Sequence, residues 1–238
     1  MGRVIRAHVL RAMLAAAGML GCGMSNSALA QAPTPWTGCY IGGSGGMSWG
    51  SSSWSNPRDG FLGTVQGGGV NIGGQTGCDW QFGQFVLGGV FDGGVSSFEG
   101  ERTALGWDFI GRIQGYQWVA ARVGVTSGPD NSGLWYLKGG VTATQYSITS
   151  IWPEMHNAYF HNNITLWGPG VGVGFEHFIG SNFTVATEFS GYYHGNSTVN
   201  LTSNTPIVPL YTVQLGQSVT YSWTFKLNYR FNAVASGP

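Results

Sequence analysis

The stretch Val219-Thr-Tyr-Ser-Trp-Thr-Phe-Lys-Leu-Asn-Tyr-Arg-Phe231 alternates apolar and polar residues over its whole length. Its odd-numbered positions are aliphatic or aromatic, whereas its even-numbered positions are Thr, Ser, Lys, Asn or Arg. Successive side chains of a β-strand point to opposite faces of the sheet, so a period of two predicts a strand with one apolar and one polar face. Working outward from this stretch, we find the same alternation repeated along the chain.

The repeated alternation predicts eight strands and no second domain. The expected strands lie near 36–48, 68–81, 84–94, 108–125, 134–146, 165–178, 182–194 and 218–231. The expected connections are short at 82–83, 126–133 and 179–181, and long at 49–67, 95–107, 147–164 and 195–217. Short turns at one rim and long loops at the other are typical of outer-membrane barrels, whose short turns lie in the periplasm. An even number of strands brings both chain ends to that rim.

The composition separates this chain from ordinary soluble domains. Charged residues make up 8% of the chain, against about 25% in soluble proteins. No apolar run after residue 30 approaches the ~20 residues that a transmembrane helix needs. A transmembrane barrel combines these properties, because one face of each strand meets lipid and the other a crowded lumen. We therefore predict an all-β fold: an eight-stranded antiparallel transmembrane up-and-down β-barrel.

The first 30 residues are expected to be a signal peptide, and residues 31–238 the barrel domain. Arg3, Arg6 and Arg11 precede an apolar run, and Ala28-Leu29-Ala30 offers small residues at a cleavage site. Processing as a lipoprotein at Cys22 is the alternative. The remaining 208 residues carry seven basic and ten acidic side chains, a net charge of −3, which does not suggest nucleic acid as a partner. From the signal peptide and the predicted barrel together we expect export to the outer membrane.

Alternation alone does not say which face is inside. A soluble eight-stranded lipocalin-like carrier, apolar inside and polar outside, is the competing fold. The polar faces are rich in glycine, as at 168–174, and small residues suit a lumen that side chains must fill. We therefore expect the apolar faces to point outward, with aromatic girdles at both membrane interfaces. The expected girdle residues are Trp36, Trp80, Trp135, Tyr229 and Phe231 at the periplasmic rim, and Trp167, Tyr193 and Tyr221 at the outer rim.

Several segments resemble the small eight-stranded outer-membrane barrel family, which includes opacity-type proteins, immunogenic porin-like proteins and the OmpA-type membrane domain. They are Trp36-Thr37-Gly38-Cys39-Tyr40-Ile41-Gly42-Gly43, Gly77-Cys78-Asp79-Trp80-Gln81, Gly174-Phe175-Glu176, Thr187-Glu188-Phe189 and Tyr229-Arg230-Phe231. The resemblance implies the barrel fold, insertion by the outer-membrane assembly machinery and contact with outer-membrane lipid. The family usually ends at its aromatic terminal residue, whereas residues 232–238 follow Phe231 here. We expect no peptidoglycan-binding domain, so the resemblance does not imply an OmpA-like tether to the cell wall.

Cys39 and Cys78 stand where the family usually has aromatic residues. On the expected strands both face outward near the periplasmic rim, on neighbouring antiparallel strands. We therefore predict a cross-strand disulfide, formed in the oxidising periplasm. Two free thiols facing lipid are the alternative.

Nine charged residues are expected to face the lumen. They are Asp79, Asp92, Arg112, Arg122, Lys138, Glu176, Glu188, Lys226 and Arg230. Basic and acidic residues are nearly equal in number among them. We therefore favour a network of ion pairs that fills the barrel, and not a path for ions, since isolated buried charges are costly. Glu176 and Glu188 resemble a catalytic carboxylate pair, but the basic residues on the same face favour salt bridges.

The sequence predicts a non-enzymatic surface protein of the outer membrane, without a cofactor or metal. Its expected role is envelope integrity, adhesion or another surface interaction, with possible host or surface ligands at its loops. A porin-like channel for small solutes or ions is the alternative, and a periplasmic lipocalin-like carrier a third. His156 and His161, in an expected loop, could bind haem or a metal, but histidines in such a loop usually have no such role.

Overall fold

The computed structural model describes residues 35–57, 60–104, 106–152, 158–203 and 210–232. The expected signal peptide, His156 and residues 233–238 lie outside these ranges. Among the described residues, no helix has the length and apolar character needed to cross a membrane.

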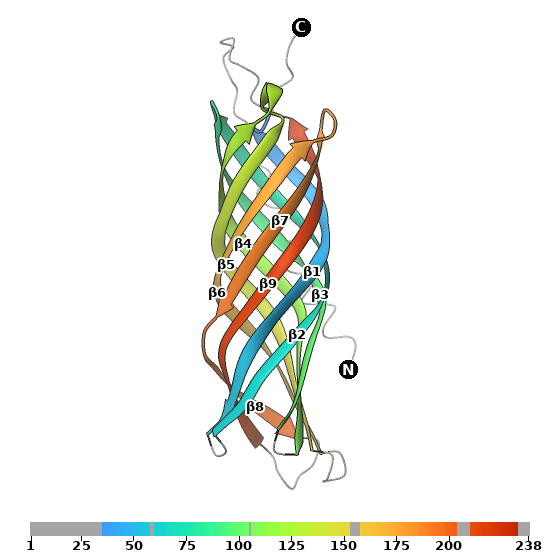
Figure 1. Cartoon of the computed structure of the whole chain (residues 1–238), viewed down its shortest axis with the longest axis vertical. Coiled ribbons are helices and arrows are strands. Elements are labelled where there is room, and N and C mark those ends of the chain that lie inside the picture. Colours follow the sequence, from blue (N-terminus) through green and yellow to red (C-terminus); the bar gives the residue numbers. More distant parts are fainter. Residues whose placement is uncertain (1–34, 58–59, 105, 153–157, 204–209, 233–238) are drawn as a thin grey trace. The chain divides into compact units, whose positions relative to one another are not determined.

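The described chain forms long antiparallel strands and one short 3₁₀ helix. The strands are β1 (Gly38–Asn56), β2 (Gly60–Phe82), β3 (Phe85–Ala104), β4 (Trp107–Ser127), β5 (Gly133–Trp152), β6 (Ala158–Phe178), β7 (Phe183–His194), β8 (Ser197–Ser203) and β9 (Leu210–Asn232). The 3₁₀ helix η2 (Pro129–Asn131) lies between β4 and β5. Sequential strands pair with each other, as expected of an up-and-down barrel (Figure 1).

The sheet closes on itself because β1 pairs with both β2 and β9. β7 and β8 keep one register against β9, since His194 faces Ser218 and Ser197 faces Leu215. They therefore act as one strand interrupted at 195–196, and the ring contains eight strands. Gly38 pairs with Asn232, so the two described chain ends lie at the same rim. These observations confirm the predicted eight-stranded antiparallel barrel.

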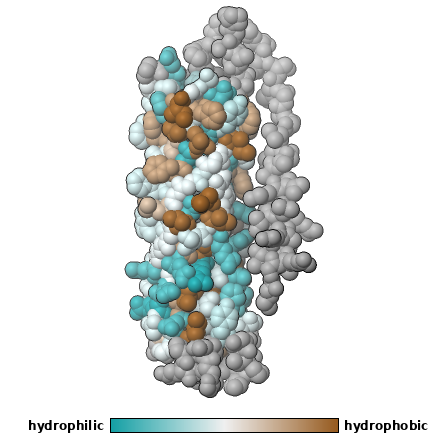
Figure 2. Space-filling model, turned by 90° about the vertical axis from the view of Figure 1, so that its right-hand side faces the viewer, coloured by the Kyte–Doolittle hydropathy of each residue, from teal (hydrophilic) through white to brown (hydrophobic). Residues whose placement is uncertain are grey.

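The barrel divides into two regions with different surfaces. We call the region with the short connections between β2 and β3, β4 and β5, and β6 and β7 the turn half. It reaches to the exposed aromatic residues Trp49, Trp167 and Tyr193, and the rest of the barrel beyond them is the far half. Apolar side chains cover the outside of the turn half, whereas polar ones gather on the far half, as one side of the molecule shows (Figure 2). An outer surface as apolar as that of the turn half requires lipid around it.

The prediction of four long loops was wrong. Most of 49–67, 95–107 and 147–164, and much of 195–217, belongs to strands that run on into the far half. In these segments most apolar residues point inward and many Ser, Thr and Asn residues are exposed. The exceptions include the buried residues Ser52, Asn56, Ser147, Thr149 and Ser150 and the exposed Phe61. Their high content of small polar residues made them resemble loops in the sequence.

Irregular pairing allows a strand to exchange its inner and outer faces between the two halves. In β4 the register against β5 shifts between Ile113 and Gly115. Trp118, Ala120 and Arg122, at even positions, are buried on one side of this bulge, and Phe109 and Ile113, at odd positions, on the other. One extra residue in a strand reverses the alternation of every residue beyond it.

Candidate functional site

The lumen of the turn half contains two closed groups of four charged side chains. The turn-end quartet consists of Asp79, Arg122, Glu176 and Arg230, from β2, β4, β6 and β9. Arg122 donates to a carboxylate oxygen of Asp79 and to one of Glu176, each at 2.7 Å. Arg230 donates to Asp79 at 2.8 Å and lies 3.5 Å from Glu176. Each cation thus bridges both anions, and the quartet has no net charge.

The central quartet is built in the same way from Asp92, Lys138, Glu188 and Lys226. The ammonium of Lys138 lies 2.6 Å from Asp92 and 3.0 Å from Glu188. The ammonium of Lys226 lies 3.0 Å from both carboxylates and also donates to Gln75. All four side chains are buried. Within a lumen shielded from water, pairing of this quality offsets the several kcal/mol that it costs to dehydrate each ion.

Aromatic rings hold the cations of both quartets from the side. The guanidinium of Arg122 lies 4.6 Å from the ring centre of Tyr136, and that of Arg230 lies 4.8 Å from the ring centre of Tyr40. The ammonium of Lys138 lies 4.1 Å from a ring centre of Trp118. Cations are attracted to the negative faces of aromatic rings. The aromatic rings therefore fill the space between the ion pairs, and the charges of the ion pairs neutralise one another.

Inward glycines make room for these rings. A β-carbon on Gly174 would lie within 2.4 Å of the Tyr136 ring, and β-carbons on Gly170 and Gly172 would crowd Trp118. The glycine-rich face predicted from the sequence does line the lumen, because large aromatics from neighbouring strands occupy the space that it leaves. The sequence analysis did not identify Tyr40, Trp118 and Tyr136 as partners of the charges. In the sequence, the run of inward glycines indicated that large side chains from neighbouring strands occupy the space beside it.

The structure places eight of the nine expected lumen charges inside and corrects the ninth. Arg112 lies on the outside of the far half, where its side chain is 53% exposed and donates to Glu99 at 2.7 Å. The bulge in β4 is the reason, since it reverses the face on which Arg112 lies relative to Arg122. The hydrogen bond from Arg112 lowers the pKa of Glu99.

Seven of the eight residues expected in the aromatic girdles are exposed on the outside, and one is not. The exposed residues are Trp80, Trp135, Tyr229 and Phe231 toward the short connections, and Trp167, Tyr193 and Tyr221 toward the far half. Trp36 is instead completely buried. Its ring packs on Phe178, and its indole N–H donates to the carbonyl of Asn131 at 2.7 Å. It precedes β1 and turns into the barrel mouth, where the guanidinium of Arg230 lies 5.0 Å from its ring centre.

Cys39 and Cys78 form a disulfide in the structure. They lie directly opposite each other on β1 and β2. Their neighbours Tyr40 and Asp79 are buried in the lumen, so the disulfide lies on the outer surface of the turn half. It joins β1 and β2 near the rim that carries the short connections.

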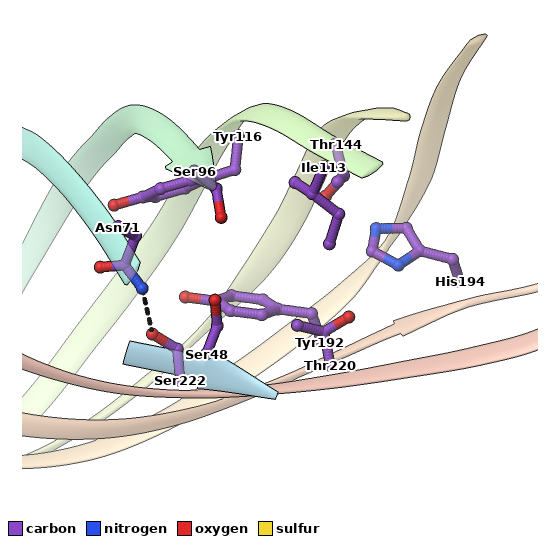
Figure 3. A pocket seen from close by; sticks show the side chains of 10 residues that line it. All are labelled: Ser48, Asn71, Ser96, Ile113, Tyr116, Thr144, Tyr192, His194, Thr220 and Ser222. Atoms are coloured by element: carbon purple, nitrogen blue, oxygen red, sulfur yellow. Dashed lines mark hydrogen bonds between the residues drawn. The ribbon is translucent and has the colours of Figure 1, made fainter. Parts of the chain in front are cut away.

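A small polar cavity lies in the lumen next to the apolar core of the far half. Its volume is about 30 Å³, which is room for one or two water molecules. Asn71 donates to Ser222 at 3.2 Å across it (Figure 3). The residues around it are Ser48, Asn71, Ser96, Ile113, Tyr116, Thr144, Tyr192, His194, Thr220 and Ser222. The cavity is too small for a hydrated ion or an organic solute.

The lumen of the far half is an apolar core. Its buried members are Trp54, Leu62, Val65, Phe98, Phe109, Ile113, Tyr146, Ile148, Phe160, Leu166, Val199, Leu201, Val213 and Leu215. Apolar side chains in contact across the ring exclude water and close this end of the barrel. The competing lipocalin-like pattern, apolar inside and polar outside, thus describes the far half correctly and the turn half incorrectly.

The outside of the far half divides into a charged and an uncharged side. Its described charged residues all lie on β3 and β4: Glu99, Glu101, Arg102, Asp108 and Arg112. We call the outer surface of β6, β8, β9 and β1 the neutral face, because its described residues include no Asp, Glu, Lys or Arg. Its exposed or half-exposed side chains include Ser51, Ser53, Ser55, Tyr159, His161, Asn162, Asn163, Thr165, Ser197, Thr198, Asn200, Thr202, Thr212, Gln214 and Gln217. Nowhere in the described ranges do three or more His, Cys, Asp or Glu side chains gather as metal ligands would.

Comparisons with known proteins identify the fold. No family model matches the chain, and no curated protein matches it. The outer membrane protein OprG from Pseudomonas aeruginosa is similar in structure, with a TM-score of 0.54 and 11% identity over 82% of this chain and 97% of that protein. This chain has the fold of an outer-membrane β-barrel.

Two further outer-membrane barrels match with lower TM-scores. The attachment invasion locus protein Ail of Yersinia pestis has 13% identity and a TM-score of 0.39, over 82% of this chain and 99% of Ail. The outer membrane protease OmpT from Escherichia coli has 11% identity and a TM-score of 0.45, over 87% of this chain and 100% of OmpT. Neither similarity assigns an activity to this chain.

Proposed function

We propose that this barrel is an integral, non-conducting protein of the bacterial outer membrane whose far half stands outside the membrane and makes surface contacts. The observation that carries the proposal is the filled lumen. Trp36 closes the mouth of the turn half, two neutral quartets fill its interior, and an apolar core fills the far half. The cavity in the lumen next to the apolar core, about 30 Å³, holds no more than water.

The proposed orientation places the short connections in the periplasm and the far half outside the cell. The apolar exterior of the turn half suits outer-membrane lipid, and the polar exterior of the far half suits water. Export would use residues 1–30 as a signal peptide, and insertion would use the outer-membrane assembly machinery. The disulfide between Cys39 and Cys78 suits the oxidising periplasm.

Cysteine labelling tests this orientation. Thr198→Cys, in β8, should react on intact cells with a maleimide that does not cross membranes. Gly180→Cys, in the connection between β6 and β7, has open space for its side chain and should react only after the outer membrane is permeabilised. Cys39 and Cys78 are bonded to each other and should not react with the maleimide. The reverse labelling pattern would overturn the orientation.

We propose a non-enzymatic role, although the protease OmpT has a barrel fold. Two features support it. The buried carboxylates of Glu176 and Glu188 are occupied by basic partners, as salt-bridging groups are. On the far half the described acidic residues lie on β3 and β4, whereas His161 lies on β6, so they do not form a paired acid and base.

Conductance separates this proposal from the porin-like channel. We expect the purified barrel in planar bilayers to show no steady open steps, while an open porin in the same bilayers shows them. Steady conductance of the unmodified barrel would favour the channel.

A further inference from the structure

The disulfide between Cys39 and Cys78 lies on the part of the barrel that lipid surrounds in the proposed orientation. Both cysteines are half-buried, and Cys39 pairs with the exposed Phe231 of β9. Beyond Cys78, toward the short connection between β2 and β3, the outward residues Trp80 and Phe82 are 50% and 65% exposed. Aromatic side chains such as these lie at the interface between lipid and water. The two sulfur atoms of the inserted barrel are therefore level with the aromatic girdle or behind it.

Oxidation of two thiols at this place in the membrane requires another protein to reach them. Thiol–disulfide exchange begins when a thiolate attacks a sulfur of a second disulfide, and it passes through a covalent intermediate between the two molecules. Lipid disfavours the charged thiolate, and a wall covered by lipid keeps out a folded protein that carries the second disulfide. A reduced barrel in the membrane is therefore a poor substrate. The unfolded chain in the periplasm, in contrast, exposes both cysteines to water.

The cysteine content of the chain suits oxidation in the unfolded state. The chain contains three cysteines, and Cys22 belongs to the expected signal peptide. After cleavage only Cys39 and Cys78 remain, so an intramolecular disulfide has no wrong partner and needs no native structure to guide it. Folding of the barrel then places the two residues directly opposite each other on β1 and β2.

Formation of the bond before the strands pair also suits the composition of β1 and β2. Glycines lie at 42, 43, 45, 46 and 50 in β1 and at 67–69, 73, 74 and 77 in β2. Glycine-rich strands specify their register weakly. A disulfide requires its two Cα atoms to lie within about 7 Å, so a bond that already exists excludes registers that separate Cys39 from Cys78. An early bond therefore guides the pairing of the first two strands.

We propose that Cys39 and Cys78 are oxidised before the barrel enters the membrane, by a periplasmic protein that carries a reactive disulfide. One cysteine thiolate attacks that disulfide, breaks its S–S bond and forms a mixed disulfide with one of its sulfurs. The thiolate of the other cysteine attacks the cysteine sulfur of the mixed disulfide, which forms the bond between Cys39 and Cys78 and releases the oxidase as a dithiol. The cysteine pair loses two electrons and two protons, and the oxidase gains them. The inference rests on the proposed function, since it needs lipid around the turn half.

Pulse-labelled bacterial cells test the order of oxidation and insertion. The full chain is expressed with Cys22→Ser, so that only Cys39 and Cys78 carry thiols. Cells are lysed in mild acid and detergent, and migration of the unboiled sample on a gel separates the folded barrel from the unfolded chain. Each form is then denatured with a maleimide of large mass, which shifts chains that have free thiols. We expect the unfolded chain to be protected already, and to become reactive in cells that lack the periplasmic disulfide oxidase.

A second cysteine pair on the same strands provides the matched control. Ser53 and Thr64 face each other on β1 and β2 in the same unbroken register as the native pair, but on the outside of the far half. Ser53→Cys and Thr64→Cys are introduced into a chain whose native cysteines are both changed to serine. In reduced barrels in phospholipid nanodiscs, a purified disulfide oxidase should act on the pair at 53 and 64 at least about tenfold faster than on the native pair, because access limits exchange. The two pairs should react equally fast in unfolded chains. If only the reduced native chain fails to insert, the bond is needed beforehand, which also supports the order.

Three results would overturn the inference. The first is free thiols in most of the unfolded chain, followed by their oxidation in the folded barrel. The second is unchanged protection of the thiols in cells that lack the oxidase. The third is oxidation of the native pair in nanodiscs as fast as that of the pair at 53 and 64. If Thr198→Cys is labelled on intact cells, such a result refutes only the early oxidation. If Thr198→Cys is not labelled on intact cells, the proposed function itself fails.

Discussion

The turn half and the far half are built on the same strands but have opposite polarity. In the turn half the charged residues of the strands face inward, together with aromatic side chains that pack on them, and the outside is apolar. The far half instead has an apolar core and a polar exterior. The backbone pairing is the same throughout, because every strand hydrogen-bonds to a neighbour on each side. A closed barrel therefore does not require a particular polarity inside. The surroundings, lipid or water, determine which side chains suit the outer face. The side chains on the opposite face fill the lumen, where their polar groups must be paired.

The largest expected effect comes from breaking the ion pairing on which the turn half depends. Arg122→Met leaves Asp79 and Glu176 to share the single cation of Arg230. The free energy of unfolding should fall by about 3–5 kcal/mol, because a buried carboxylate loses its partner. Urea unfolding in lipid vesicles, followed by tryptophan fluorescence, measures it. Arg112→Met is the matched control, and its exposed ion pair should cost at most about 1 kcal/mol. Equal losses for the two variants would contradict the difference between lumen and surface.

The next effect tests whether the far half depends on its apolar core. Leu201→Ala removes a completely buried side chain and should cost about 3 kcal/mol, through lost burial and a cavity. Hydrogen exchange should accelerate in the far parts of β6, β8 and β9 and remain slow in the turn half. Leu227→Ala, whose side chain is exposed on the turn half, should have a smaller effect. Uniform acceleration along the whole barrel would show that the two halves do not open separately.

A smaller effect locates the boundary between the halves on a single strand. Val171 and Thr165 both lie on the outside of β6, the first in the turn half and the second in the far half. Val171→Arg should destabilise the inserted barrel by about 2 kcal/mol, the cost of a charge facing lipid away from the interface. Thr165→Arg should change it by less than about 0.5 kcal/mol, as surface substitutions usually do. Similar values for the two variants would mean that the lipid boundary lies elsewhere.

The smallest effect concerns the one described ion pair on the outside of the far half. Arg112→Met should raise the pKa of Glu99 toward its ordinary value, because the hydrogen bond from Arg112 lowers it. A lowered pKa means that the pair stabilises the fold above the ordinary pKa of a glutamate, and that this contribution fades as pH falls through the lowered value. Carboxyl-selective NMR titration measures the change. Arg102→Met, on the same pair of strands, is the control and should leave the titration of Glu99 unmoved.

Residues of the turn half were predictable from the sequence because a strict period of two relates them. The stretch from Val219 to Phe231 and the inward glycines of β6 gave the faces correctly, and the pairing of Cys39 with Cys78 followed from neighbouring antiparallel strands. Arg112 was misplaced because a bulge adds one residue without any mark in the composition. Trp36 was misplaced because it precedes the first strand, where alternation no longer determines direction.

An eight-stranded barrel with little charge could be predicted from the sequence alone, because alternation and small residues assign most side chains to a face. The way in which the lumen is closed could be seen only in the folded barrel. Asp79, Arg122, Glu176 and Arg230 come from four strands far apart in the chain, and they meet only when the sheet closes on itself. The reversal of polarity in the far half was likewise decided there, because a strand can point its apolar residues inward only where a closed ring offers them an interior.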